Sequence, residues 1–129
     1  MTSARLYIAV VDDEASVRTA LRRLLCLAEY EVAVFGCGGE FLASLAARHP
    51  DCAILDVHMP GLSGFDVQAR LCAARSDVPV VFITASDDLA LDQKALAAGG
   101  GTLLRKPFSN DALLAAVDAA LRSKACDAR

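Results

Sequence analysis

Polar side chains that could carry out chemistry follow four short apolar runs of the sequence, at the point where each run ends. Asp12 and Asp13 close the first run, and Asp56 closes the third. Thr84 ends the fourth run, and Lys106 follows the fifth. Carboxylates bind divalent cations, whereas hydroxyl and ammonium groups bind phosphoryl oxygens. If the fold brings these side chains together, they form a phosphate-receiving site that depends on a metal ion.

The carboxylates predict a hard divalent cation at this site. Three carboxylates in one place repel one another, which raises the pKa of at least one unless a cation neutralises them. No Cys or His stands at metal-ligand spacing, so an oxygen-only ligand set favours Mg²⁺, which also leaves positions open for a phosphoryl donor. A carboxylate such as Asp56 can itself be the nucleophile, which gives an aspartyl phosphate.

Five apolar runs rich in β-branched residues predict strands, and segments with helical periodicity lie between them. The predicted strands cover residues 6–11, 32–35, 52–55, 78–84 and 102–104. Near-continuous apolar strands that alternate with helices predict an α/β fold with a doubly wound five-stranded parallel sheet. In such a sheet the functional crevice lies beyond the carboxyl ends of the strands, where the polar residues stand.

Helix start signals agree with this pattern, and the chain reads as one domain. The signals are Ser16, the pair Asp87 and Asp88, and the pair Ser109 and Asn110. The last helical periodicity ends at Leu121, so we expect one domain over residues 1–122 and a tail or the start of a linker over residues 123–129.

Composition excludes several classes of protein. The net charge is −3 and no cluster of Lys and Arg is interleaved with aromatic residues, so we expect no direct nucleic-acid binding. Five widely spaced cysteines without a C-x-x-C motif indicate free thiols in a reducing compartment. No segment has the length and apolarity of a signal peptide or a membrane helix, so we expect no membrane association and a cytoplasmic location.

Four motifs carry a resemblance to a known family. The segments VVDDE, ILDVHMPGLSG, FITA and KPF stand in this order at the ends of successive predicted strands. Together they resemble the receiver domain of bacterial two-component response regulators (CheY-like) over roughly residues 5–122. The resemblance implies strand order 2-1-3-4-5. It also implies that Asp56 accepts a phosphoryl group from a sensor histidine kinase.

The resemblance also assigns roles around the metal and the phosphoryl group. It implies that Asp13 binds Mg²⁺ directly, that Asp12 binds it largely through water and that the backbone carbonyl of His58 completes the protein ligands. The phosphoryl group then lies against Thr84 and Lys106. A cis bond is expected between Lys106 and Pro107, as in similar domains.

The implied function is a phosphoacceptor switch rather than an enzyme, although it assists its own phosphorylation and dephosphorylation. The altered surface binds an output domain or a downstream protein, and phosphorylation-linked homodimers are possible in this class. Receivers usually place Tyr or Phe three residues before the KPF lysine, whereas here that position is Leu103. We therefore expect Thr84 and Leu103 to form the switch, with weak coupling to the fourth helix and fifth strand.

Other interpretations remain open at this point. The aspartates at 12 and 13 could cap the first helix, Thr84 could be an ordinary strand residue, and Lys106 could be a surface lysine. The chain could be a degenerate receiver that only binds proteins, or a flavodoxin-like cofactor carrier. The latter needs aromatic side chains around a flavin, and the chain has no Trp and only two Tyr. For the His58 side chain we expect a solvent-facing position that tunes access of water.

Overall fold

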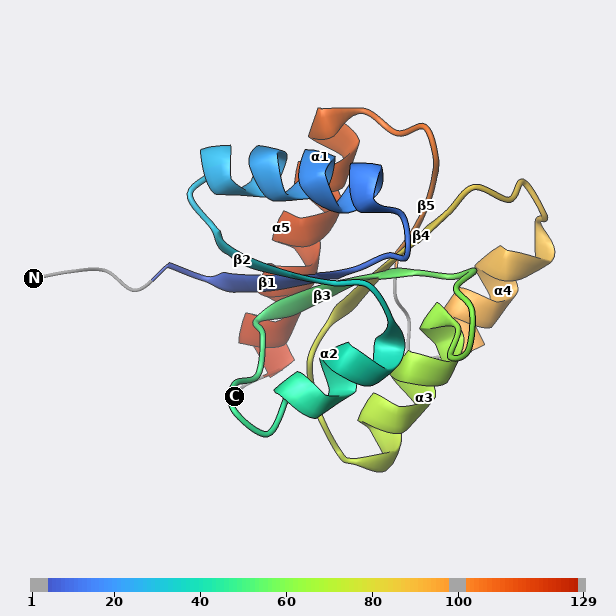
Figure 1. Cartoon of the computed structure of the whole chain (residues 1–129), viewed down its shortest axis with the longest axis horizontal. Coiled ribbons are helices and arrows are strands. Elements are labelled where there is room, and N and C mark those ends of the chain that lie inside the picture. Colours follow the sequence, from blue (N-terminus) through green and yellow to red (C-terminus); the bar gives the residue numbers. More distant parts are fainter. Residues whose placement is uncertain (1–4, 98–101, 128–129) are drawn as a thin grey trace, which may run out of the picture.

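The computed structural model describes residues 5–97 and 102–127, which form five strands and five helices in strict alternation (Figure 1). The strands are β1 (Tyr7–Val11), β2 (Glu31–Phe35), β3 (Cys52–Asp56), β4 (Val80–Thr84) and β5 (Thr102–Arg105). The helices are α1 (Ala15–Leu27), α2 (Gly38–Ser44), α3 (Gly64–Ala73), α4 (Ala90–Ala97) and α5 (Asn110–Asp127). The five predicted strands are confirmed, with small shifts at their ends.

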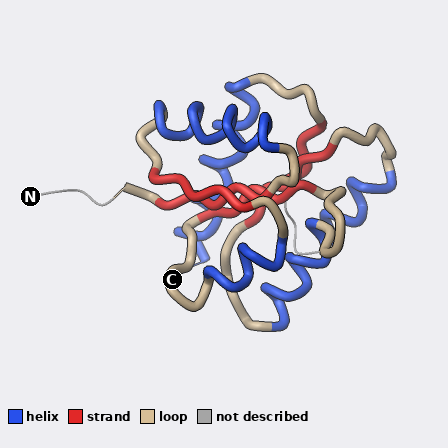
Figure 2. Tube along the Cα trace, in the orientation of Figure 1, coloured by secondary structure: helices blue, strands red, loops and turns tan. Residues whose placement is uncertain are grey.

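All five strands are parallel, in the order β2-β1-β3-β4-β5. They form one central layer with helices on both sides (Figure 2). The order confirms the doubly wound α/β fold. The chain starts in the middle of the sheet, moves to one edge and then returns past its start. β1 and β3 are therefore neighbours, and the strand order reverses between them. Ligands bind beyond the carboxyl ends of the strands at such a point.

Two hydrophobic layers enclose the sheet, because successive strand residues point to opposite faces. Ala9, Leu55 and Phe82 face the layer that contains α2, α3 and α4. Ile8 and Ile54 face the layer of α1 and α5. Helices cover both faces (Figure 1), which explains why the strands are apolar along their whole length.

Helix starts follow the sequence signals with one difference. The Ser109 hydroxyl accepts a hydrogen bond from the Ala112 amide at the start of α5, and Asp88 accepts one from the Ala90 amide at the start of α4. α1 begins at Ala15, with Glu14 in the N-cap position, so Ser16 already lies inside the first turn. The chain passes from β1 into α1 with a short connection, and Asp12 accepts a hydrogen bond from the amide of Glu14 just before the helix.

The last helix is longer than the sequence pattern predicted. α5 continues to Asp127, so helical structure does not end near residue 122. The division of the chain at residue 122 into a domain and a tail stays a prediction.

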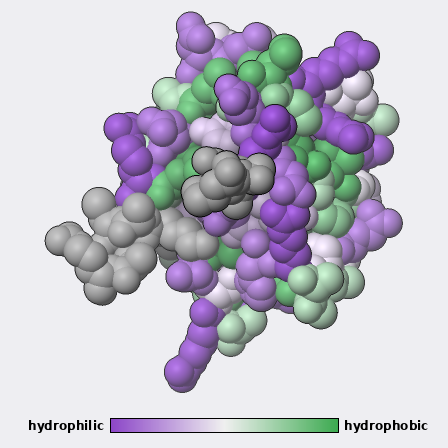
Figure 3. All heavy atoms as spheres, turned by 90° about the vertical axis from the view of Figure 1, so that its left-hand side faces the viewer, coloured by the Kyte–Doolittle hydropathy of each residue, from purple (hydrophilic) through white to green (hydrophobic). Residues whose placement is uncertain are grey.

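In the described part of the chain, no helix combines the length and apolarity that a membrane crossing requires. Figure 3 views the end of the sheet where the strands begin, and hydrophilic and hydrophobic side chains are intermixed there.

Candidate functional site

Three aspartates meet at the carboxyl edge of the sheet. Asp56 is the last residue of β3, and Asp12 and Asp13 follow β1, which pairs with β3 in parallel. One carboxylate oxygen from each of the three lies within 4.8 Å of the others. Asp12 is fully buried and Asp56 is 4% exposed, whereas Asp13 is open to solvent. The predicted acidic cluster is therefore confirmed, and its donor set fits a hard divalent cation.

Lys106 directs its ammonium group into the same cluster. Its Nζ lies 3.0 Å from Asp12 Oδ2 and 3.8 Å from Asp56 Oδ1. Burial by itself lowers the pKa of Lys106, but the hydrogen bond to Asp12 and the charges of Asp56 and Asp12 outweigh it, so the pKa is raised. The lysine is therefore a permanent cation at the site, and it is not a solvent-exposed surface lysine.

The carboxyl group of Asp56 has a strongly raised pKa. Burial is the largest cause and the charge of Asp12 is the next, while Lys106 acts in the opposite direction. Together they raise the pKa of Asp56 from its ordinary 3.8 to about 7. A second cation would relieve this repulsion, so the cluster is electrostatically incomplete with Lys106 alone.

Thr84 ends β4 beside the aspartates, and its side chain is fully buried. Its hydroxyl oxygen accepts a hydrogen bond from the Ser86 amide at 3.0 Å, and its backbone carbonyl accepts one from the Lys106 amide at 2.7 Å. The residue before it, Ile83, pairs with Asp56 in register. Neighbouring strand ends therefore bring Thr84, Lys106 and the aspartates to one edge of the sheet.

The segment after Asp56 turns sharply and returns over its own backbone. Gly61 has φ +78°, a conformation that other residues rarely adopt. A Cβ placed on Gly64 would lie 2.6 Å from the Asp56 carbonyl oxygen, so the first turn of α3 packs directly on the backbone of Asp56. The side chain of His58 is exposed, as expected. The peptide bond between Lys106 and Pro107 is cis, as the resemblance implied.

The residue at the expected switch position, Leu103, is half-buried on β5 and packs against the hydrophobic layer that contains Phe82. Three consecutive glycines, residues 99–101, precede β5 in the sequence, where they predict a loosened loop, and they lie outside the described residues.

Sequence reasoning missed two residues that support the acidic cluster. Arg18 of α1 donates from Nη1 to the Asp12 carbonyl oxygen at 2.8 Å, which ties α1 to the end of β1. Glu14 places Oε1 3.6 Å from Lys106 Nζ and is the third carboxylate beside the lysine, after Asp12 and Asp56. Glu14 belongs to the VVDDE motif and was a detectable candidate. Nothing in the sequence pointed to Arg18 except its position one helical turn after Glu14.

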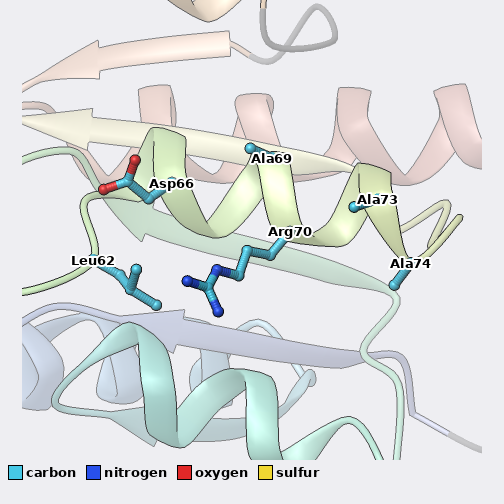
Figure 4. A pocket seen from close by; sticks show the side chains of 6 residues that line it. All are labelled: Leu62, Asp66, Ala69, Arg70, Ala73 and Ala74. Carbon is cyan, nitrogen blue, oxygen red and sulfur yellow. The ribbon is translucent and has the colours of Figure 1, made fainter.

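A groove of about 570 Å³ lies along α3, away from this chemistry. Figure 4 shows the small side chains of Ala69 and Ala73 on the helix, Ala74 just after its end, and the long side chain of Arg70 extending from the helix. Leu62 and Asp66 complete the lining. None of the site residues predicted from the sequence lines this groove, so it is separate from the acidic cluster.

The two tyrosines stand far from where a flavin carrier would need them. Tyr7 begins β1, and Tyr30 immediately precedes β2. Both therefore lie at the amino ends of parallel strands, opposite to the crevice at the carboxyl ends. Neither tyrosine can therefore stack against a flavin bound in that crevice, which argues against the flavodoxin-like alternative.

The fold and the cluster define a doubly wound α/β protein with a candidate cation site and the charged Lys106 beside it. Comparison with known proteins identifies the family. A family model described as the response regulator receiver domain matches residues 8–118. The chain therefore belongs to the response regulator receiver domains of two-component systems.

Individual relatives and solved structures agree with this assignment to the receiver family. Nodulation protein W of Bradyrhizobium diazoefficiens is 37% identical over 118 residues, which are 92% of this chain and 52% of that protein. The receiver structure from Burkholderia phymatum has a TM-score of 0.82 and 47% identity, covering 91% of this chain and 95% of that one. Chemotaxis protein CheY4 of Vibrio cholerae has a TM-score of 0.83 and 29% identity, covering 91% and 99%. The chain spans about half the length of the curated relatives it matches.

Proposed function

We propose that this receiver domain is a phosphorylation-dependent switch in which Asp56 is the phosphoacceptor. The carrying observation is the position of the Asp56 carboxylate, which lies in a cluster of three aspartates and 3.8 Å from the Lys106 ammonium. A buried carboxylate with a raised pKa is a marker of functional sites rather than of stabilising ones. The donor is a sensor histidine kinase, and the partner of the altered surface is an output domain or a downstream protein.

Asp12, Asp13 and Asp56 bring their carboxylate oxygens together and would hold Mg²⁺. The proposal adds the backbone carbonyl of His58 as a further ligand. When bound, the ion supplies positive charge that offsets the repulsion among these carboxylates and the charge of the incoming phosphoryl group. Asp12 already uses one oxygen for the Glu14 amide and the other for Lys106. Its contribution to the ion through water, rather than directly, agrees with that engagement.

The chain's own groups carry the transfer as follows. An Asp56 carboxylate oxygen attacks phosphorus, a new O–P bond forms, and the P–N bond of the donor phosphohistidine breaks with its electron pair leaving on the imidazole. Lys106 places its ammonium where negative charge develops on the phosphoryl oxygens. Thr84 keeps its hydroxyl proton available, because its only described hydrogen bond is one that its oxygen accepts. It can therefore donate to a phosphoryl oxygen.

Labelling with a small phosphodonor tests the assignment. Acetyl phosphate should phosphorylate the protein only in the presence of a divalent ion, and borohydride trapping followed by peptide mass spectrometry should locate the product at Asp56. Asp56→Asn should abolish the label, whereas Asp118→Asn, on the exposed surface of α5, should retain it. A label that persists at full yield in Asp56→Asn, or that needs no divalent ion, would contradict the proposal. A chain that is never labelled would instead be a protein-binding module.

A further inference from the structure

The loop between β4 and α4 is held by a chain of hydrogen bonds that begins at Thr84. The Ser86 amide donates to the Thr84 hydroxyl oxygen at 3.0 Å, and the Asp88 amide donates to the Ser86 hydroxyl oxygen at 3.1 Å. The Ala90 amide donates to Asp88 Oδ1 at 3.0 Å. Each side chain accepts from the amide two residues further on, so the chain connects the buried hydroxyl to the first residue of α4.

Arg105 closes this chain from the neighbouring strand. It pairs with Thr84 in the register of β4 and β5, and its side chain reaches over the loop to α4. Its Nη2 donates to the Asp88 carbonyl oxygen at 2.7 Å, and its Nη1 lies 3.2 Å from Asp92 Oδ1. Thr84 and Arg105 are therefore neighbours in the sheet, and both are connected to Asp88. Thr84 is connected through Ser86, and Arg105 by a direct hydrogen bond.

The guanidinium of Arg105 differs from an ordinary surface cation. Its side chain is 30% exposed, and one of its two contacts is to main chain, so it fixes the loop itself. Its Nε is buried and has no hydrogen-bond partner among the described residues. By contrast, Arg122 and Asp118 form an ion pair within α5 in which the side chains are 73% and 57% exposed. That pair ties no separate elements together.

We propose that Arg105 is a positioning residue that holds the β4–α4 loop and α4 in the arrangement of the unphosphorylated domain and so opposes activation. The inference rests on the proposed function of Asp56. When the Thr84 hydroxyl turns toward a phosphoryl group on Asp56, its oxygen leaves the Ser86 amide and the loop must rearrange. The contacts of Arg105 with Asp88 and Asp92 resist this rearrangement, because they exist in only one of the two states.

The contacts of Arg105 with Asp88 and Asp92, called the clamp from here on, matter more because residue 103 is a leucine. An aromatic ring at that position would fill space vacated by Thr84 and stabilise the activated state. Leu103 is already packed against the layer that contains Phe82, so it adds little stability to the activated state. The contacts of Arg105 on the same strand are then the larger difference between the two states, and they favour the resting one.

Beryllofluoride binding in the presence of Mg²⁺ measures this balance, because the complex imitates the phosphoryl group on Asp56. Arg105→Ala should bind beryllofluoride about three- to tenfold more tightly than the wild type, as a partly exposed ion pair and one charge-assisted hydrogen bond are lost from the resting state. Asp92→Asn should give a smaller increase, because the bond to the Asp88 carbonyl remains. Arg122→Ala is the matched control and should not change the affinity.

Two further measurements separate positioning from general destabilisation. Titration with ¹⁵N NMR should show amide shifts over residues 87–97 that are larger and more complete in Arg105→Ala than in the wild type. Mg²⁺ affinity without beryllofluoride should be equal in the two proteins, since none of the contacts of Arg105 is to Asp12, Asp13 or Asp56.

The outcomes distinguish the inference from the function on which it rests. A wild type that binds no beryllofluoride with Mg²⁺ would overturn the proposed function of Asp56 and this inference with it. A wild type that binds, together with Arg105→Ala and Asp92→Asn variants of equal or weaker affinity, would overturn the role of Arg105 alone. If Arg105→Ala does not fold, the Asp92→Asn affinity decides: an increase supports the clamp, and no increase refutes it.

Discussion

Replacing Asp56 with asparagine should stabilise the metal-free protein at alkaline pH. The carboxyl group is 4% exposed, and burial followed by the charge of Asp12 raises its pKa to about 7. At pH 8 the folded protein must therefore keep a charge that its surroundings oppose. Asparagine has nearly the same shape without that charge, so the change removes the repulsion and leaves the packing.

The raised pKa sets the size and the sign of this effect. Because the folded state holds the Asp56 proton more firmly than the unfolded state, the free energy of unfolding falls as the pH rises from about 4 to about 7. At about 1.4 kcal/mol per pH unit, the interval between 3.8 and about 7 gives a ceiling of about 4 kcal/mol. Solvent at the exposed Asp13 and local relaxation screen the charge, so we expect a gain of about 2 kcal/mol at pH 8.

Urea unfolding in the presence of a chelator gives the measurement. The gain in unfolding free energy of Asp56→Asn should be near 2 kcal/mol at pH 8 and much smaller at pH 4, where the carboxyl group is protonated in the folded state and close to half protonated in the unfolded state. Asp118→Asn provides a control for loss of an exposed carboxylate and should show no such gain. Saturating Mg²⁺ should stabilise the wild type and have much less effect on Asp56→Asn. An equal gain at both pH values, or a loss at pH 8, would refute the electrostatic reasoning.

Two other substitutions test separate parts of the site. Lys106→Ala should slow labelling by acetyl phosphate at least about tenfold, because the ammonium that meets the phosphoryl group is lost, while Mg²⁺ affinity is kept or increased. Equal losses of both would instead indicate a disturbed fold, which circular dichroism would reveal. Gly64→Ala should lower the free energy of unfolding by about 1–3 kcal/mol, because the added methyl group meets the Asp56 carbonyl oxygen. Gly39→Ala, where an added Cβ meets nothing within 4 Å, is its control, and equal stability of the two variants would disprove the close approach.

The sequence predicted the fold and the place of the site for the same physical reason. Continuous apolar strands separated by helices permit little besides a parallel sheet, and parallel strands end at one edge. Polar residues at the carboxyl ends of four of these strands must then lie at the same edge, whatever the exact strand limits. The predicted strand over residues 78–84 is observed as Val80–Thr84, yet Thr84 still lies at the site.

The clamp formed by Arg105 could not be predicted in this way. Its contacts join β5 to the loop and to α4, so they depend on how far a long side chain reaches across two elements. The sequence shows an arginine before the KPF motif but gives no sign that Asp88 and Asp92 lie within its reach. The length of α5 was missed for a different reason. Apolar periodicity reports only the helical part that packs against the sheet, whereas backbone hydrogen bonds continue the helix to Asp127.

The proposed phosphorylation site and the contacts of Arg105 have opposite effects on the equilibrium between the resting and the active arrangement of the β4–α4 loop. In the proposed switch, a phosphoryl group on Asp56 would attract the Thr84 hydroxyl and the Lys106 ammonium, and this attraction would favour the rearranged loop. The bonds from Arg105 to Asp88 and Asp92 favour the resting loop. The fraction of phosphorylated protein in the active arrangement depends on the difference between these two free energies. If the proposal is right, a change at Arg105 should alter the strength of the response without changing Thr84 or Lys106, the groups proposed to contact the phosphoryl group.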